Sequence, residues 1–177
     1  IRLSLVGSEM CIRDRSYKTP LRYPGGKSRA LSKLFQFIPD LKDYTEFREP
    51  FLGGGSVAIE IGKRYPHIDI WVNDLYEPLY NFWKVLQSDG QKLRDILIQL
   101  KQRHSDPSSA KQLFLDAKDY LAKPVGNSID RAVSFYVVNK CSFSGLTESS
   151  AFSKQASESN FSVNGIETVS YTHLRAH

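Results

Sequence analysis

The chain has 177 residues, of which 41% are hydrophobic and 24% are charged, and this composition suffices for one globular core. Its formal net charge of +5 is compatible with a polyanionic partner, but many proteins without such a partner carry as much charge. The chain has two cysteines, Cys11 and Cys141, which excludes a disulfide framework and a zinc site built on cysteine.

Both ends of the chain differ from the rest. Neither Ile1–Ser16 nor Thr168–His177 continues an apolar period or carries a clear cap or turn signal, and both resemble adapter sequence translated as coding sequence. The apolar run Leu3–Val6 is too short for a signal peptide, and no apolar run approaches the ~18 residues that span a bilayer. We therefore expect a soluble cytoplasmic protein with a native segment Tyr17–Glu167 between two foreign tails, 1–16 and 168–177.

The first half of the native segment alternates between helical and extended patterns. The predicted order is a helix that starts at an N-cap Ser28 and runs to Ile38, a strand over Tyr44–Phe51, a glycine turn at 53–55, a helix that Pro66 ends and a strand over Ile68–Asn73. This order predicts a βαβ unit of the doubly wound α/β class.

From Asp74 on, the apolar period is that of a helix. Four apolar stripes follow, at Leu79–Leu86, Leu93–Leu100, Leu113–Leu121 and Ile129–Val137. Because four successive helices do not continue an α/β alternation, we interpret the region from about Ser88 to Gly165 as a helical insertion or second domain. It is expected to end in the serine-rich loop Ser142–Ser162.

The first cluster with chemical meaning is Glu49-Pro50-Phe51-Leu52-Gly53-Gly54-Gly55-Ser56, where a strand opens through three glycines into a helix. Glycine permits a positive φ and lets the backbone approach a ligand without a Cβ clash. Asp74 ends the next strand, where a carboxylate in a nucleotide-binding α/β fold accepts hydrogen bonds from a ribose diol. A tight turn without ligand, a capping role for Asp74 before Pro78, and the dinucleotide site of a dehydrogenase are the alternatives.

A second cluster, Leu21-Arg22-Tyr23-Pro24-Gly25-Gly26-Lys27-Ser28, places a glycine turn before the first predicted helix. A Walker A phosphate loop is excluded, because Leu21 stands where that motif requires glycine. The turn instead brings an aromatic ring and a lysine to a helix start, which suits a ligand with an adenine ring and a carboxylate. Tyr23 as a core residue and Lys27 as a solvated charge are the simpler alternatives.

Together and in this order, the two clusters resemble the Dam-like, D12 class family of adenine-N6-specific DNA methyltransferases. That family has a Trp/Tyr-x-Gly-Gly-Lys loop, then Glu-Pro-Phe-x-Gly-x-Gly-Ser and then an Asn-Asp pair, matched here by residues 23–27, 49–56 and 73–74. The resemblance implies S-adenosylmethionine as cofactor, with Gly53 and Gly55 along its methionine part and Asp74 on its ribose hydroxyls. The cofactor-binding residues that it implies are Tyr23, Gly26, Lys27, Glu49, Pro50, Phe51, Gly53, Gly55, Ser56 and Asp74.

The same resemblance implies a domain organisation and a set of partners. Residues 17–87 are expected to form the cofactor-binding part of a Rossmann-like methyltransferase core, and residues 88–167 an inserted helical target-recognition domain. Double-stranded DNA is the expected substrate, and a cognate restriction endonuclease is a possible partner; no metal and no membrane are implied. The candidate DNA contacts, in a loosely matched segment, are Asn139, Lys140, Ser144 and Gly145.

The family's catalytic Asp-Pro-Pro-Tyr tetrapeptide is absent from this sequence. In that motif a carboxylate and a carbonyl polarise the exocyclic amine, while the aromatic ring stacks on the flipped adenine. The nearest string, Asp106-Pro107-Ser108, is expected only to start a helix. We therefore expect an incomplete chain that has no catalytic residue and transfers no methyl group alone. An NAD-type nucleotide-dependent oxidoreductase and a catalytically dead DNA-binding module are the alternatives.

Overall fold

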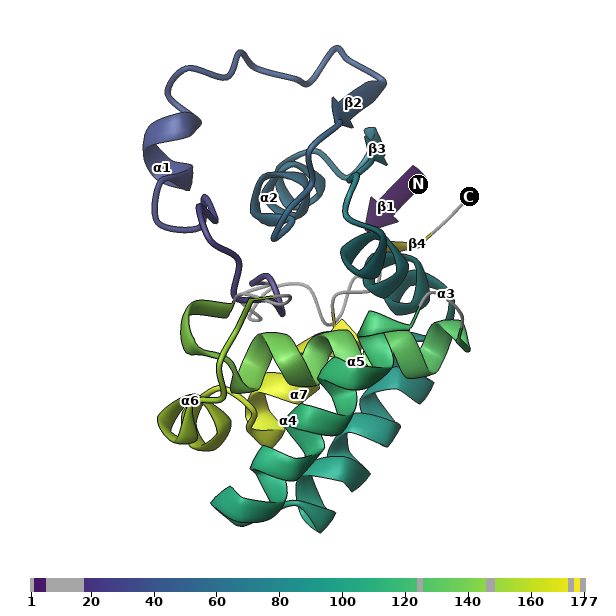
Figure 1. Ribbon diagram of the computed structural model, residues 1–177. Helices are drawn as coiled ribbons and strands as arrows, with labels where there is room; N and C mark the ends of the chain where they lie inside the picture. The colour runs from purple at the N-terminus through teal and green to yellow at the C-terminus, as the bar shows by residue number, and fades with distance from the viewer. Residues whose placement is uncertain (1, 6–17, 124–125, 146–148, 172–173, 176–177) are drawn as a thin grey trace.

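The computed structural model describes residues 2–5, 18–123, 126–145, 149–171 and 174–175 (Figure 1). The strands are β1 (Arg2–Leu5), β2 (Glu46–Glu49), β3 (Asp69–Val72) and β4 (Leu174–Arg175). The helices are α1 (Leu31–Leu34), α2 (Ser56–Arg64), α3 (Glu77–Arg103), α4 (Pro107–Ala122), α5 (Ser128–Cys141), the 3-10 helix η1 (Phe143–Gly145), α6 (Lys154–Ser159) and α7 (Val163–Tyr171). Figure 1 shows the sheet with α1 and α2 in the upper part and the other helices packed together below, while α3 reaches from one part into the other.

The sheet has the order β2-β3-β1-β4, and β2 and β3 form its parallel pair. Glu46 pairs with Asp69 and Glu49 with Val72, so the carboxyl ends of both strands lie at one edge. α2 connects the two strands and buries Ala58 and Ile61 in the same core as the sheet residues. The βαβ unit expected from the sequence is therefore present, although both strands are shorter than predicted because they pair over only four residues.

The helical part is centred on α5, whose side chains from Arg131 to Cys141 are all buried. α5 packs between α3 and α4, which explains why even polar residues such as Asn139 and Lys140 are buried on this helix. α3 has Pro78 in its first turn, as the sequence indicates, and it is interrupted by non-helical geometry at Asp89 (φ −136°, ψ 30°). The two apolar stripes predicted on either side of Asp89 thus belong to one kinked helix.

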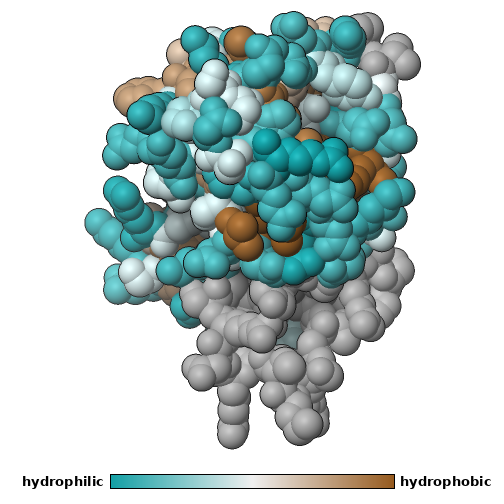
Figure 2. Space-filling view, turned by 90° about the horizontal axis from the view of Figure 1, so that it is seen from below, coloured by the Kyte–Doolittle hydropathy of each residue, from teal (hydrophilic) through white to brown (hydrophobic). Residues whose placement is uncertain are grey.

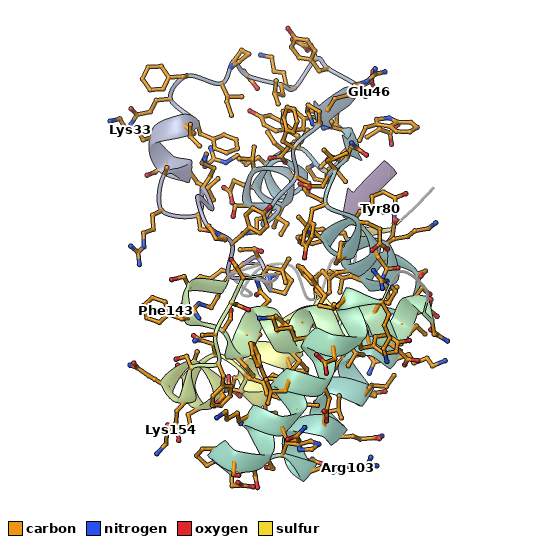
Figure 3. All side chains as sticks on the ribbon, in the orientation of Figure 1. Lys33, Glu46, Tyr80, Arg103, Phe143 and Lys154 are labelled. Carbon is orange, nitrogen blue, oxygen red and sulfur yellow. The ribbon has the colours of Figure 1, made fainter. Side chains whose placement is uncertain are left out.

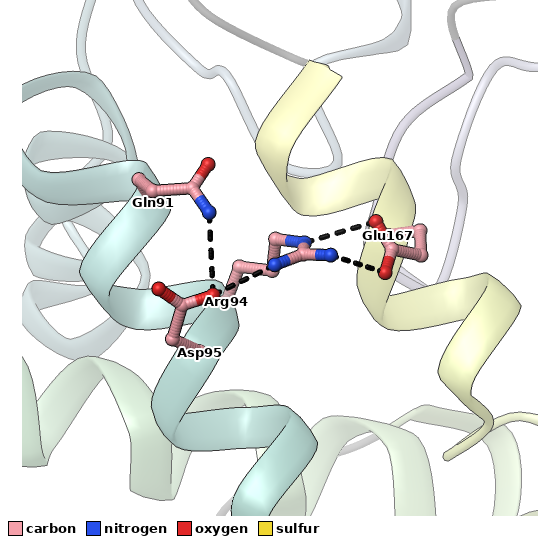
Figure 4. Close-up of polar contacts among 4 residues, drawn as sticks. All are labelled: Gln91, Arg94, Asp95 and Glu167. Carbon is pink, nitrogen blue, oxygen red and sulfur yellow. Dashed lines mark hydrogen bonds and ion pairs between the residues drawn. The ribbon is translucent and has the colours of Figure 1, made fainter.

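α7 is tied to this helical part by polar and apolar contacts. The Arg94 guanidinium of α3 forms a bidentate ion pair with the Glu167 carboxylate of α7 (Figure 4). The Tyr136 hydroxyl donates to the Gly165 carbonyl at 3.0 Å, and Val169 is fully buried. The expected boundary after Glu167 therefore falls inside a packed helix.

The structure differs from the sequence-based expectation at three places. Ser28 does not cap a long helix, because its Oγ instead hydrogen-bonds Ser56 Oγ at 2.8 Å, and α1 is only one short turn. The stretch Ser142–Ser162 is not all loop: it contains α6, which Ser153 caps by accepting from the Ala156 N–H.

The third difference concerns the two ends, which were expected to take no part in the fold. Residues 2–5 form β1, which pairs antiparallel with β3 and with β4. A strand edge such as that of β3 offers unpaired backbone N–H and C=O groups, which any extended segment can use regardless of its side chains. The backbone pairing therefore accounts for this placement, although Ile1–Ser16 as a whole continues no apolar period.

The surface of the helical part is mainly polar. Figure 2, which views the molecule from below, shows that the coloured part of this face is largely hydrophilic, with hydrophobic spots between polar side chains. Isolated exposed apolar residues of this kind are normal on globular proteins and need no partner.

Candidate functional site

The loop between β2 and α2, which we call the glycine loop (residues 52–56), contains two glycines in the left-handed conformation. Gly53 has φ +50° and Gly55 has φ +69°, values in the left-handed region that favours glycine. The Gly55 N–H donates to the Leu52 carbonyl at 2.9 Å, and the Leu52 N–H donates to the Asn73 carbonyl at 2.8 Å. These bonds fix the glycine loop at the end of β3, at the edge where both parallel strands terminate.

Asp74 follows β3 and holds the glycine loop directly. Its Oδ2 accepts a hydrogen bond from the Gly53 N–H at 2.8 Å, and its Oδ1 accepts one from the Tyr76 N–H at 3.1 Å. Since an ionised carboxylate has about four lone-pair sites, two backbone bonds leave it able to accept further bonds from ligand hydroxyls. Tyr76 is the N-cap residue of α3, so Asp74 orders the turn that leads into that helix, but no side chain caps the free N–H groups of the first turn of α3.

Tyr23 lies directly on the glycine loop. A Cβ added to Gly53 would stand 3.0 Å from Tyr23 Cε1, and one added to Gly54 would stand 3.0 Å from Tyr23 Cβ. The ring therefore packs on glycine backbone that no side chain covers. Burial, and in second place the charge of Asp74, raises the pKa of the Tyr23 hydroxyl, which keeps it protonated.

The segment around Tyr23, which we call the tyrosine loop (residues 21–28), is a tight turn. The Gly26 N–H donates to the Tyr23 carbonyl at 2.9 Å, and Gly25 has φ +73°. The exposed Lys27 ammonium donates back to the Gly25 carbonyl at 2.8 Å. Lys27 thus lies at the rim of the turn, where a bound carboxylate could replace the carbonyl as its partner.

A pocket of about 230 Å³ lies between the tyrosine loop and the glycine loop. Its lining residues are Tyr23, Pro24, Gly25, Gly26, Lys27, Glu49, Phe51, Leu52, Gly53, Gly54, Gly55, Ser56 and Val57. All the sequence-predicted cofactor residues are among them except Pro50, which is exposed beside the pocket, and Asp74, which touches its wall through Gly53. Residues from two distant segments of the sequence are thus brought to one cavity.

Asn139, expected to contact DNA, is instead fully buried near the end of α5. Its Oδ1 accepts from the Arg22 N–H at 3.0 Å, and its Nδ2 donates to the carbonyls of Arg22 at 2.6 Å and Gly145 at 2.9 Å. The structure differs from the expectation here, because α5 is enclosed and the Asn139 amide uses these bonds to join the tyrosine loop to the turn at Gly145.

Lys140 is buried as well, being 8% exposed. Its ammonium lies 5.3 Å from the centroid of the Tyr136 ring. Burial, and in second place the positive charge of Arg22, lowers the pKa of Lys140 to about 8. The two cations lie near each other, so a negatively charged group at this place would relieve a repulsion.

The turn after α5 presents the other two candidate residues. Ser144 is exposed and adopts a φ of +65°, which is strained for a residue with a side chain. Gly145 follows with φ +73°, and a Cβ there would stand 2.5 Å from the Arg22 carbonyl oxygen. The ring of Phe143, 73% exposed, projects outward from this turn (Figure 3). A second pocket, of about 360 Å³, lies between Ser144 and the tyrosine loop.

The chain matches a known protein family over most of its length. The family model described as D12 class N6 adenine-specific DNA methyltransferase matches residues 23–175 of the chain. The chain belongs to this family. The matched region starts at Tyr23 and contains the glycine loop, Asp74 and the turn after α5, and it extends beyond the expected boundary at Glu167.

Two curated relatives agree with this membership. The DNA N-6-adenine-methyltransferase of Escherichia phage P1 is 30% identical over 126 residues, which cover 71% of this chain and 15% of the phage protein. The Type II methyltransferase M.MjaIII of Methanocaldococcus jannaschii is 27% identical over 133 residues, covering 71% of this chain and 46% of that protein. The chain thus spans less than half the length of either relative. A dehydrogenase, one of the alternatives, is not favoured by these matches.

Glu49 is a half-buried carboxyl in the lining of the pocket. Glu49 ends β2, and its Oε2 accepts from the Ala58 N–H of α2 at 3.0 Å. Burial raises the pKa of this carboxyl to about 7, and the hydrogen bond from Ala58 only partly opposes the rise. A cationic group bound in the pocket would favour the ionised form of Glu49.

Two residues that contact the loops around this pocket could not be identified from the sequence. Trp83 was placed in an apolar helical stripe, but its indole Nε1 also donates to the Gly53 carbonyl at 3.1 Å. Arg22 was quoted as part of a motif without a role, yet its backbone is held by Asn139 and its guanidinium donates to the Ser142 carbonyl at 3.3 Å. Helical period indicates which face is buried, and it does not indicate which loop that face meets.

Groups of metal-ligating side chains and membrane-spanning helices are both absent from the described part of the chain. No group of three or more histidine, cysteine, aspartate or glutamate side chains there could hold a metal ion. Among the same residues, no helix combines the length and the apolar character needed to cross a membrane.

Proposed function

We propose that this chain binds S-adenosylmethionine in the pocket between the tyrosine loop and the glycine loop, and that it serves methyl transfer to adenine N6 in double-stranded DNA. The observation that carries the proposal is the meeting of Tyr23 with Gly53 and Gly54 at one cavity, in a chain of the D12 class family. The bound cofactor supplies the activated methyl group, and the residues of the chain bind and orient it.

The donor groups of the pocket fit the two ends of this cofactor. Lys27 carries a positive charge that suits a carboxylate, and Glu49 can offer a negative charge to an amino group. Asp74 retains acceptor capacity for the ribose hydroxyls, and the exposed ring of Phe51 lies on the same rim. A carboxylate, an ammonium and apolar surface are therefore placed around a single cavity, as a zwitterionic nucleoside derivative requires.

The finer assignment of domains follows from this proposal. Residues 17–87 act as the cofactor-binding part of a Rossmann-like core, and residues 88–167 act as the target-recognition part. In support, β2, α2 and β3 form the parallel βαβ unit, while α3, α4 and α5 form the helical part beside it. Residues 168–171 extend the helical part through α7.

DNA is proposed to approach the turn after α5. Ser144 is exposed there, Gly145 and the buried Asn139 shape the turn, and Lys140 with Arg22 adds positive charge behind it. Phosphate oxygens are the natural partners of such cations, whereas base edges are read by groups that reach into a groove. The proposal includes a cognate restriction endonuclease, a separate protein that would cleave the same DNA sequence.

Calorimetric titration tests the cofactor part directly. We expect the full chain to bind S-adenosylmethionine and to show no binding of NAD at the same concentrations. Binding of NAD in preference to S-adenosylmethionine would reject the proposal. A catalytically dead DNA-binding module would instead bind double-stranded DNA without any response to the cofactor.

Methyl transfer is tested separately from binding. Because the Asp-Pro-Pro-Tyr motif is absent from the sequence, we expect no tritium transfer from labelled S-adenosylmethionine into adenine by this chain alone. Cofactor binding by itself lowers no barrier unless groups at the reacting centre stabilise the transition state. Robust transfer would show that other residues of the chain polarise the adenine amine.

A further inference from the structure

Gly53 is held on both sides by side chains that lie outside the glycine loop. Its N–H donates to Asp74 Oδ2 at 2.8 Å, and its carbonyl accepts from Trp83 Nε1 at 3.1 Å. The direction of the N–H depends on φ and the direction of the carbonyl depends on ψ. The two bonds together therefore fix the left-handed conformation of Gly53, which has φ +50°.

Trp83 is itself rigidly placed. It is 1% exposed and lies in α3, and its ring packs edge-on against Phe82 with centroids 5.7 Å apart. The same indole also packs on the next glycine of the loop, because a Cβ added to Gly55 would stand 2.7 Å from Trp83 Cζ2. One side chain of α3 thus contacts both left-handed glycines of the glycine loop.

The aromatic contacts continue from Trp83 into the helical part. Phe82 stacks on Tyr136 of α5 with centroids 6.0 Å apart, and Tyr136 packs edge-on against Phe161. Lys140, behind the proposed DNA-binding turn, lies over the same Tyr136 ring. The indole of Trp83 is therefore the point where this aromatic cluster meets the pocket.

We propose that Trp83 is a positioning residue for the cofactor: its indole N–H holds the Gly53 carbonyl and thereby keeps the pocket wall in its binding conformation. The inference rests on the proposed function of the pocket. A residue that served only the core would need the volume of the indole and not its N–H, since the hydrogen bond adds direction rather than buried area. Removing only the N–H therefore separates positioning from packing.

The test replaces Trp83 with a β-(benzothienyl)alanine residue, in which sulfur takes the place of the indole N–H. The chain has two tryptophans, Trp71 and Trp83. The replacement is therefore made in a Trp71→Phe background, so that only the tryptophan at position 83 is exchanged. Trp71 lies on β3 and lines none of the described pockets. Tyr136→Phe is the control, because it keeps an aromatic ring in the same cluster and removes only the hydroxyl that donates to the Gly165 carbonyl, away from the pocket.

We expect the affinity for S-adenosylmethionine, measured by calorimetry, to fall about three- to tenfold with benzothienylalanine at position 83, in the range of one lost hydrogen bond. Tyr136→Phe should lower the melting temperature and leave the affinity unchanged. Equal affinities of the benzothienylalanine protein and its Trp71→Phe parent would overturn the role of Trp83 while the proposed function stands. No binding by the folded wild-type chain would overturn the proposed function and this inference together.

Discussion

The Asp74 carboxylate accepts a hydrogen bond from the Gly53 N–H at 2.8 Å, across 21 positions of the sequence. The same carboxylate accepts from the Tyr76 N–H, so it joins the glycine loop to the start of α3 before any ligand binds. Asp74 therefore serves the fold as well as the proposed ribose contact. The two roles require different properties of Asp74. The bonds from the Gly53 and Tyr76 N–H groups need only an acceptor oxygen, whereas the ribose contact is strengthened by the full negative charge.

We predict that Asp74→Ala lowers both stability and cofactor affinity. Loss of the Gly53 and Tyr76 bonds should reduce the free energy of unfolding by about 1.5–3 kcal/mol, the range for a hydrogen bond to a charged group. The affinity for S-adenosylmethionine should drop at least about tenfold, equivalent to ~1.4 kcal/mol. Urea denaturation and calorimetric titration measure the two effects.

Asp74→Asn is the matched control, because the amide keeps one acceptor oxygen and removes the charge. It should retain more of the stability than Asp74→Ala and still bind the cofactor more weakly than wild type. If Asp74→Ala left the cofactor affinity unchanged, Asp74 would only hold the glycine loop and the turn before α3 in place.

The glycines of the pocket should differ in their tolerance to a methyl group. Gly55→Ala places a Cβ 2.7 Å from the Trp83 ring at a φ of +69°, so strain and overlap add, and we expect a loss of about 2–4 kcal/mol. Gly25→Ala has a similar φ of +73° with open space around the Cβ, so only the backbone cost of about 1–2 kcal/mol applies. Chemical denaturation of the two variants measures the difference, and equal losses would contradict the close packing of Trp83 on Gly55.

The sequence predicted the glycine turn and the helix ends beside the pocket, for a physical reason. Glycine at positions 53 and 55 and proline at 66 and 78 act through their own backbone restrictions, which do not depend on the rest of the fold. The turn after β2, the end of α2 and the first turn of α3 accordingly lie where the pattern places them. Asp106 likewise caps α4 through the N–H groups of Ser108 and Ser109, as its motif indicates.

The sequence could not predict which polar groups bond to each other when they lie far apart along the chain. Ser28 has the pattern of an N-cap, but it bonds Ser56, and that contact depends on how two loops meet. Asn139 reads as a surface contact in the family motif, but it is buried because α4 and α3 enclose α5. The boundary at Glu167 was placed by a loss of periodicity, whereas α7 continues to Tyr171 and buries Val169.

We predict a pH-dependent contribution of Glu49 to stability. The raised pKa of about 7 means that the folded chain holds a proton on Glu49 that the unfolded chain has already released. The stabilising contribution of that proton is therefore complete below the unfolded pKa and decreases as pH rises towards 7, after which it is constant. Above pH 7 the ionised carboxylate remains buried at a cost.

Glu49→Gln removes this titration while it keeps an acceptor for the Ala58 N–H. The difference in unfolding free energy between wild type and variant should shift in favour of the variant as the pH rises from about 5 to about 8. Denaturation series at several pH values measure this difference. The contributions of the other titrating groups are the same in both proteins and therefore cancel. Parallel profiles for the two proteins would mean that Glu49 has an ordinary pKa.

The residues after Glu167 provide the last prediction, because the pattern and the structure differ there. Val169 is fully buried, and the Thr168 hydroxyl donates to the Gly165 carbonyl at 2.6 Å. A chain that ends after Tyr171 should therefore be more stable than one that ends after Glu167, by about 1.5–3 kcal/mol for the burial of one valine side chain.

Val169→Ala in the full chain is the control for this comparison, since it removes apolar area without changing the length of α7. It should reproduce a large part of the loss, about 1–2 kcal/mol, because about 0.8 kcal/mol accompanies each buried CH₂ group and a cavity adds to it. Thermal and urea denaturation of the three proteins give the ranking. If the chain ending after Glu167 and the chain ending after Tyr171 unfold with the same free energy, residues 168–171 add nothing to the fold, and Thr168–His177 is the foreign tail that the sequence pattern predicts.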